Sequence, residues 1–268
     1  MSMLSIVTVC YNEEKDIKRT IESVLQQDTT DFEYIICDGL SKDRTVEIAE
    51  SYKNKFKEKG ISYSIYSEKD GGVYFGMNNG IERANGRYIW FLNAGDWLCD
   101  SNALNRMMAL ASEKEFPDVV YGDYFVVDKN IPILNHSMHT HLKKEMSIGH
   151  PASMVLASVM RENKFNTKYR IAADYNLFLG LFLKEKRFEH LESAVSYFPV
   201  GGISTVNIKE SLEEANSVRL SYGIASEIPE IKEKSSKDKI YETLKNSLPG
   251  WLWKFWNVNI KKRDWVEM

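Results

Sequence analysis

The stretch WFLNAGDWL, residues 90–98, has the pattern of a buried strand that ends abruptly in polar residues. Five apolar or aromatic residues, from Tyr88 to Leu92, run into Asn93 and then Asp96, with two small residues between them. In open α/β sheets, ligands bind in the crevice outside the carboxyl ends of the strands, so a carboxylate at this position would face a site. The same residues could instead form an ordinary turn in which Asp96 caps the next helix.

The chain around this stretch alternates between predicted strands and helices. Apolar or alternating runs predict strands over residues 4–12, 32–39, 61–70, 87–96 and 118–128. Residues with helical spacing lie between them, and a helix opened by glycine is expected at 71–86. Repeated strand–helix units with short links predict an α/β fold with a mostly parallel sheet flanked by helices.

Composition narrows the class of protein. The chain has 268 residues, 43% of them apolar, and a formal net charge of -3. This charge balance offers no basic excess for nucleic acid, so we expect none as a partner. The three cysteines, Cys10, Cys37 and Cys99, fit no paired metal spacing and are expected to be reduced. With no signal peptide pattern and no run of eighteen apolar residues, a cytoplasmic protein is expected.

Polar side chains follow four successive predicted strands. Asn12, Asp38, Asp70 and Asp96 each come just after the carboxyl end of a different strand, which places all four along one edge of the sheet. Such a cleft can hold a nucleotide and a divalent cation, because hard cations take oxygen ligands. The turn after the first strand, CYNEEKD, contains no glycine, which argues against a dinucleotide fingerprint and a P-loop.

These residues resemble glycosyltransferase family 2, whose members have the GT-A fold. The resemblance is to the bacterial branch that builds exopolysaccharide, capsule or O-antigen. It rests on five stretches in the family's order: SIVTVCYNEEKDIKRTIESVLQQ, FEYIICDGLSKDRTVEIAE, SEKDGGVYFGMNNGIERANGRYIWFLNAGDWL, GHPASMV and IAADYNLFL. Together they span residues 5 to about 180. The resemblance implies a GT-A domain over residues 1–205 and leaves 206–268 as a C-terminal helical appendage.

The resemblance also implies which residues bind the donor. A UDP-sugar would contact residues at the exits of the first three strands: Thr8, Tyr11, Asn12, Asp38 and Asp70. The segment LNAGD occupies the place of the family's D-x-D motif, so Asp96 would hold Mn²⁺ or Mg²⁺ at the donor diphosphate. Asn93 and Gly95 replace the usual first and middle aspartates, which leaves one carboxylate ligand. Asn93 and His150, in GHPASMV, are expected to contact the diphosphate or the acceptor.

Family members of this kind are inverting, so a single base on the acceptor side suffices. Asp174, in IAADYNLFL, matches the position that bears the base. A carboxylate there could take the proton of an acceptor hydroxyl in a glycan or a lipid-linked saccharide. The alternative is that Asp174 only complements the dipole of a helix start.

Two other functions compete with transfer. The loss of aspartates at positions 93 and 95 fits a degenerate protein that binds a nucleotide-sugar without catalysis. A sugar nucleotidyltransferase would need a Gly-rich basic loop after the first strand, and CYNEEKD offers acids and one lysine.

The histidines and the C-terminus leave further questions. His139 and His141 have an H-x-H spacing that suggests zinc, but the segment lacks companion cysteines and favours a polar connecting loop.

The apolar pattern near the C-terminus predicts a helix over 207–223 with Leu212, Ala215 and Leu220 as core positions. Residues 248–268 combine four Trp with basic residues, which suits peripheral contact with the inner membrane surface. Alternatively, these aromatic residues close the core or form a homodimer contact.

Overall fold

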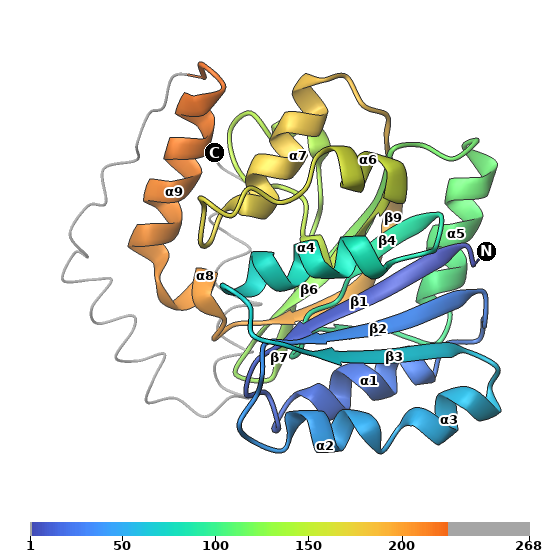
Figure 1. Cartoon of the computed structure of the whole chain (residues 1–268). Helices are drawn as coiled ribbons and strands as arrows, with labels where there is room; N and C mark the ends of the chain where they lie inside the picture. The colour runs from blue at the N-terminus through green and yellow to red at the C-terminus, as the bar shows by residue number, and fades with distance from the viewer. Residues whose placement is uncertain (1, 225–268) are drawn as a thin grey trace.

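The computed structural model describes residues 2–224, which form one nine-stranded mixed sheet flanked by helices (Figure 1). The strands are β1 (Leu4–Cys10), β2 (Phe32–Asp38), β3 (Ser62–Ser67), β4 (Tyr88–Phe91), β5 (Trp97–Leu98), β6 (Val119–Asp128), β7 (Ile131–Asn135), β8 (Ser153–Leu156) and β9 (Phe188–Pro199). The helices are α1 (Ile17–Leu25), α2 (Thr45–Glu50), α3 (Lys53–Glu58), α4 (Val73–Arg83), α5 (Ala103–Glu113), α6 (Ala157–Glu162), α7 (Ala173–Leu183), α8 (Ile203–Val206) and α9 (Ile208–Ser221). Short 3-10 helices span His139–His141 and His150–Ala152.

The first half of the sheet has the predicted parallel arrangement. Strands β3, β2, β1 and β4 lie side by side in that order, and all three pairings are parallel. Alternate residues of β1 enter two cores: Ile6 packs on the side of α1 and α5, and Val7 on the side of α4 and α7. Apolar residues on both faces explain why β1, β2 and β4 appear as continuous apolar runs.

The second half of the sheet departs from a simple parallel series. β8 is antiparallel to both β4 and β6, whereas β6 and β9 pair in parallel. The predicted fifth strand, β6, therefore does not extend the parallel half directly. Strands β5, β7, β8 and β9 have no counterpart in the sequence interpretation, because their short or irregular patterns do not show which partner they pair with.

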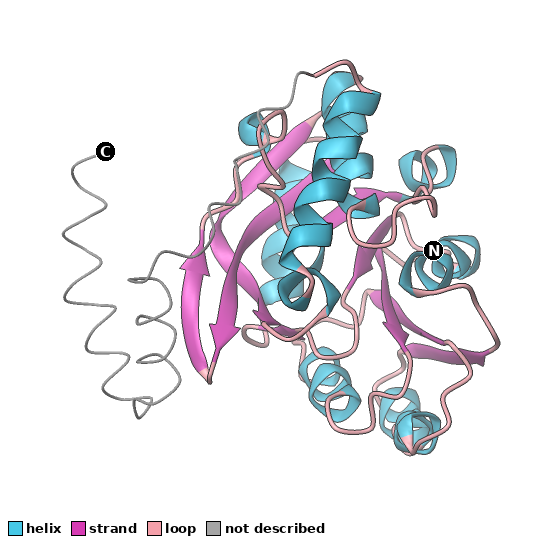
Figure 2. Ribbon diagram, turned by 90° about the vertical axis from the view of Figure 1, so that its left-hand side faces the viewer, coloured by secondary structure: helices cyan, strands magenta, loops and turns pink. Residues whose placement is uncertain are grey.

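α9 confirms the predicted helix, but its core positions were partly misassigned. Leu212 and Leu220 are exposed, whereas Asn216 and Val218 are buried, and Ala215 packs against the core. α9 packs on α7 and stands at the left of Figure 1, so it faces the viewer in Figure 2. The pattern failed here because apolar residues occupy more than one side of the helix, and only packing against α7 determines which side is buried.

Other expectations can be compared directly with the structure. The three cysteines are free, and Cys10 and Cys37 are buried. Among residues 2–224, no helix is both long and apolar enough to cross a membrane. The predicted membrane segment 248–268 lies outside the described residues, and the domain boundary at residue 205 stays a prediction.

Candidate active site

A cleft opens along the carboxyl edge of β3, β2, β1 and β4. It consists of two adjoining cavities of about 640 and 470 Å³, whose walls share Glu13, Val73, Asn93 and Ala94. As predicted, the residues that follow the four parallel strands gather at this edge, since parallel strands end on the same side of a sheet. The larger cavity continues from there between α7, β9 and α9.

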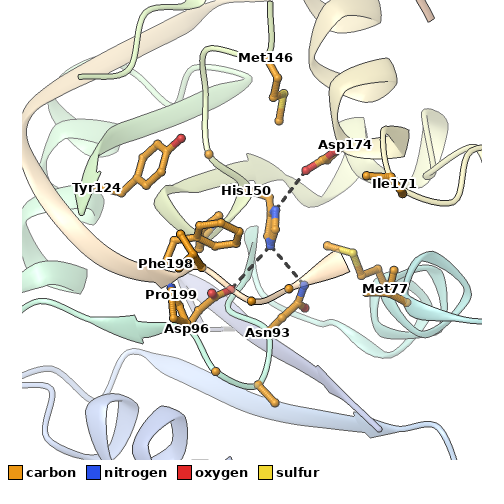
Figure 3. Close-up of a pocket in the computed structure, with 18 of the residues that line it drawn as sticks. Met77, Asn93, Asp96, Tyr124, Met146, His150, Ile171, Asp174, Phe198 and Pro199 are labelled. Atoms are coloured by element: carbon orange, nitrogen blue, oxygen red, sulfur yellow. Dashed lines mark hydrogen bonds and ion pairs between the residues drawn. The ribbon is translucent and has the colours of Figure 1, made fainter. Parts of the chain in front are cut away.

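A chain of polar contacts crosses the larger cavity, with His150 at its centre (Figure 3). His150 Nδ1 donates to Asp174 Oδ2 at 3.1 Å. On the other side of the ring, Nε2 lies 3.2 Å from Asn93 Nδ2 and 3.7 Å from Asp96 Oδ2. One imidazole therefore connects the residue predicted to bind metal with the residue predicted to act as base, across 78 positions of sequence.

Local structure fixes each of these side chains. Gly95 takes a φ of +103°, which lets the chain turn so that Asp96 N bonds back to Asn93 O. Thr20 of α1 locks that turn, because its hydroxyl donates to Asp96 O and accepts from Gly95 N. The residue Asp96 is therefore part of a turn, as the alternative interpretation suggested, but its carboxylate also faces the cleft.

His150 and Asp174 are positioned from the opposite side of the cleft. His150 begins a 3-10 helix, and Trp90 of β4 donates its indole N–H to the carbonyl of Pro151 in that helix at 3.0 Å. Asp174 lies in the first turn of α7 and accepts hydrogen bonds from Tyr175 N at 2.8 Å and Tyr74 Oη at 3.0 Å. Asp174 therefore lies where it can complement the dipole at the start of a helix, as the alternative interpretation suggested, and it also lines the cavity.

The charges of Asp96, His150 and Asp174 depend on one another. Burial alone would lower the pKa of His150, but hydrogen bonds from its ring to Asp174 and Asp96 outweigh that effect and raise the pKa to about 9. Burial raises the pKa of Asp96, and His150 opposes this effect. When the ring is neutral, Asn93 Nδ2 can donate to Nε2; when it is protonated, Nε2–H is directed to the Asp96 carboxylate.

The smaller cavity contains the predicted nucleotide side of the site. Tyr11 and Asp70 line it, together with Gly39 and Lys69. Tyr11 is 58% exposed and lies against Gly39, whose missing Cβ leaves room for both Tyr11 and Asp70. Such an open aromatic ring beside a carboxylate can stack on a nucleobase and accept its N–H groups.

Asn12 shapes this end of the cleft through the backbone. It takes a φ of +55°, its N–H donates to Ser41 Oγ at 2.8 Å, and its Oδ1 accepts from Lys42 N at 2.8 Å. These bonds tie the loop after β1 to the loop after β2, so the side chain of Asn12 holds the two strand exits together.

Asp38 and Thr8 occupy internal positions that the sequence did not suggest. Asp38 is buried and its carboxylate accepts hydrogen bonds from Ser41 N, Ser41 Oγ and Ser67 Oγ. Thr8 is fully buried and donates to Leu92 O at 2.6 Å. Neither lines the two cavities, so in this structure they support the strand exits from behind.

The donor set at the D-x-D position fits a divalent cation that also takes oxygens from a substrate. Asn93 Oδ1 is buried and, among residues 2–224, has no hydrogen-bond partner, and the Asp96 carboxylate lines the same wall. Mg²⁺ commonly uses one or two carboxylates and completes its shell with substrate phosphates. The described part of the chain holds no cluster of three or more His, Cys, Asp or Glu that would bind a metal without such help.

Two cleft residues, Arg19 and Glu13, were missed in the sequence. Arg19 stacks its guanidinium 3.9 Å from the Trp97 ring centre and donates to Gly95 O at 3.2 Å. Glu13 lines both cavities, and burial raises its pKa. The signal was available, because α1 begins directly after the loop that leaves β1 and its first turn must lie beside the same sheet edge.

The other histidines lie outside the cleft. His136 and His190 donate to the buried carboxylate of Asp123, and His139 bonds the hydroxyl of Tyr121 at 2.6 Å. These bonds hold the segment after β7 against β6 and β9, which agrees with a connecting segment in preference to a zinc site.

Comparisons with known proteins identify the family of this chain. The family model described as Glycosyl transferase family 2 matches residues 5–176. A PGL/p-HBAD biosynthesis glycosyltransferase of Mycobacterium bovis is 31% identical over 79% of this chain and 83% of its own length. A UDP-Glc:alpha-D-GlcNAc-diphosphoundecaprenol beta-1,3-glucosyltransferase of Escherichia coli is 27% identical over 82% of this chain and 86% of its own length.

The fold also matches solved structures. Staphylococcus aureus TarS, solved in complex with UDP-GlcNAc, superposes with a TM-score of 0.66 at 21% identity. That match covers 81% of this chain and 64% of the TarS chain. At this level of identity the likeness supports the GT-A fold alone.

Proposed function

The chain belongs to glycosyl transferase family 2, and from its cleft we propose that it transfers a sugar from a UDP-sugar to a lipid-linked saccharide with inversion. The observation that carries the proposal is the chain of contacts through His150, which places a carboxylate at each side of one cavity. Asp96 lies at the side that adjoins the nucleotide cavity, and Asp174 lies on the opposite side of the His150 ring (Figure 3).

In this proposal the donor lies across both cavities. Tyr11 and Asp70 hold the nucleoside in the smaller cavity, and the diphosphate lies at Asn93 and Asp96. Arg19 and the His150 imidazolium add positive charge at this point, which offsets the charge that the diphosphate gains as it leaves. A divalent cation held by Asp96 and Asn93 Oδ1, when bound, would supply further stabilisation of that charge.

The acceptor enters from the side of Asp174. Its hydroxyl oxygen attacks the anomeric carbon, the bond from that carbon to the diphosphate oxygen breaks, and the electron pair leaves with the diphosphate. Asp174 takes the proton of the attacking hydroxyl. Tyr74 and His150 hold the two carboxylate oxygens in place, so that the base is preorganised on the face opposite the nucleotide. A single attack of this kind inverts the anomeric configuration.

The proposal of a lipid-linked acceptor is based on the names of two relatives. The Escherichia coli relative is named for transfer to GlcNAc-diphosphoundecaprenol, and a Campylobacter jejuni relative, 25% identical over 90% of this chain, is named for transfer to a PP-undecaprenol glycan. Both names describe a saccharide on a polyprenyl diphosphate, which is the acceptor class we propose here.

The experiment is a transfer assay on the full chain. UDP-Glc, UDP-Gal, UDP-GlcNAc and GDP-Man are each incubated with Mn²⁺ and GlcNAc-diphosphoundecaprenol, and the products are identified by mass spectrometry and NMR. We expect a glycosylated lipid from one UDP-sugar, with inverted configuration at the new linkage. Selective binding of UDP without transfer to any acceptor would instead support the degenerate binding protein.

One observation supports the second candidate function, a protein that binds nucleotide-sugars without catalysis. The donor set at the D-x-D position has one carboxylate, and a histidine lies against it. If the protein only binds nucleotide-sugars, the wild type will bind UDP but will transfer no sugar from any UDP-sugar to the acceptor or to water when Mn²⁺ is present.

A further inference from the structure

The two ends of the larger cavity differ in polarity. Its reactive polar groups gather near His150, whereas much of the rest of the wall is apolar and includes Met146, Ile148, Ile171 and Val200. Figure 3 shows Met146 beyond Asp174, on the side away from Asn93 and Asp96. A sugar requires hydrogen-bond partners over most of its surface, so this wall is better suited to a hydrocarbon.

The apolar wall continues onto the surface along α9. Ser211 and Ala215 of α9 line the cavity. Residues three and four positions apart share one face of a helix, so Ile208 and Leu212 lie on the same face as those two residues. Ile208 is 62% exposed and Leu212 is 39% exposed.

Two residues beside α9 extend this surface. Val206, at the end of α8, is 67% exposed, and Val200, which follows β9 and lines the cavity, is 39% exposed. We call Val200, Val206, Ile208 and Leu212 the mouth patch. Exposed apolar residues grouped near the opening of a cavity mark an interaction site more strongly than single scattered ones do.

We propose that the mouth patch and the apolar wall bind the hydrocarbon chain of the lipid-linked acceptor, while its saccharide end reaches Asp174. This inference rests on the proposed function and adds the part of the site that selects the lipid. Val200 belongs both to the patch and to the wall of the cavity that contains Asp174, and Ile208 and Leu212 share a helix face with the wall residues Ser211 and Ala215, so a flexible chain can lie along both. A second copy of the protein seated on the patch would instead close the opening through which an acceptor must enter.

α9 also supplies a matched control. Leu220 is 56% exposed on the same helix but does not line the cavity. It lies twelve residues after Ile208, about 18 Å along the helix axis, and points in a different direction. Leu220→Ser therefore removes a similar exposed side chain without touching the mouth patch.

The test uses the full chain and two prenyl phosphates of different length. Undecaprenyl phosphate in detergent micelles is compared with dimethylallyl phosphate, which has the same allylic phosphate on one isoprene unit. Binding of each, and of UDP, is measured by calorimetry for the wild type, the double variant Ile208→Ser with Leu212→Ser, and Leu220→Ser. Melting temperatures and binding to vesicles of phosphatidylglycerol and phosphatidylcholine are measured in parallel.

We expect the wild type and Leu220→Ser to bind undecaprenyl phosphate at least about tenfold more tightly than dimethylallyl phosphate. The double variant should lose most of that preference and keep its UDP affinity and melting temperature. Equal loss in Leu220→Ser, or a preference retained by the double variant, would overturn the inference. A melting temperature lowered in the double variant alone would also overturn it, because the patch would then be covered by the protein itself.

Two further outcomes separate the competing explanations. Loss of vesicle binding in the double variant, with no chain-length preference in the wild type, would make the patch a bilayer contact and overturn the proposal. Failure of every form to bind UDP would contradict the proposed function, whereas UDP binding without prenyl selectivity would contradict only this inference.

Discussion

Replacing His150 by glutamine should separate the charge of the imidazole from its size. The ring is largely buried and lies between Asp96 and Asp174, so the variant leaves two buried carboxylates without their cation. Removing one partner of such a group typically destabilises a protein by about 3 to 5 kcal/mol. The rise in the pKa of His150 from 6.5 to about 9 corresponds to about 3 kcal/mol, the lower end of that range.

The sign of the pH dependence follows from that rise. A group whose pKa is higher in the folded protein stabilises it fully below its unfolded pKa of 6.5, and this contribution is lost as the pH rises through about 9. At pH 6 the free energy of unfolding of the wild type should therefore be about 3 kcal/mol larger than that of His150→Gln. This difference corresponds to a melting temperature about 6 to 12 °C higher. The difference should nearly vanish by about pH 10.

Urea unfolding of both proteins in EDTA at pH 6, 8 and 10 provides the measurement. His141→Gln is the matched control, because His141 is exposed and its side chain has no part in the cleft. Equal stability of His150→Gln and the wild type at pH 6, or a deficit of the same size at every pH, would refute the reasoning.

Four other substitutions probe the cleft and its support. Asp70→Asn should weaken UDP binding about tenfold with an unchanged melting temperature, since Asp70 lines the smaller cavity, whereas an unaltered Kd would remove it from the donor site. Asp38→Asn should instead lower the free energy of unfolding by about 1 to 3 kcal/mol in urea titrations, because its internal hydrogen bonds are lost, and wild-type stability would contradict this. Asp96→Asn should abolish transfer in the product assay while the chain still folds, and turnover within twofold of the wild type would exclude Asp96 from the site. Gly80→Ala should destabilise α4 against β1 by about 1 kcal/mol in thermal melts, because the added Cβ would lie 2.5 Å from Val7 Cγ1; a more stable variant would show that helix propensity outweighs packing.

The parallel half of the fold could be predicted because its signals are local. β1, β2 and β4 are buried on both faces, so they appear as continuous apolar runs, and polar residues mark where each one ends. The positions of β8 and β9 could not be predicted, because they depend on pairing between segments distant in sequence, such as β4 with β8. Residues Lys53–Glu58 form a helix separate from Thr45–Glu50, and the apolar spacing across them gave no sign of that break.

The site was predictable in position more than in detail. Asp96 and Asp174 lie within recognisable stretches, and the structure brings them to one cavity. The link between them through His150 depends on the fold, since residues 93, 150 and 174 meet only when α7 and the 3-10 helix pack against the exit of β4. The internal role of Asp38 was missed because the sequence shows that a carboxylate follows the strand but not that Ser41 and Ser67 enclose it.

The central claim is that Asp174 removes the proton of the acceptor hydroxyl. The most direct measurement is the single-turnover transfer rate of Asp174→Asn, with the UDP-sugar and acceptor that support turnover in the wild type, beside calorimetric affinity for UDP. We expect the rate to fall by a factor of about 10² to 10⁴ while UDP affinity changes far less, because the amide cannot accept the proton, whereas Asp174 affects the diphosphate only through His150. A transfer rate within about twofold of the wild type would contradict the claim, since general-base catalysis is expected to contribute far more than that.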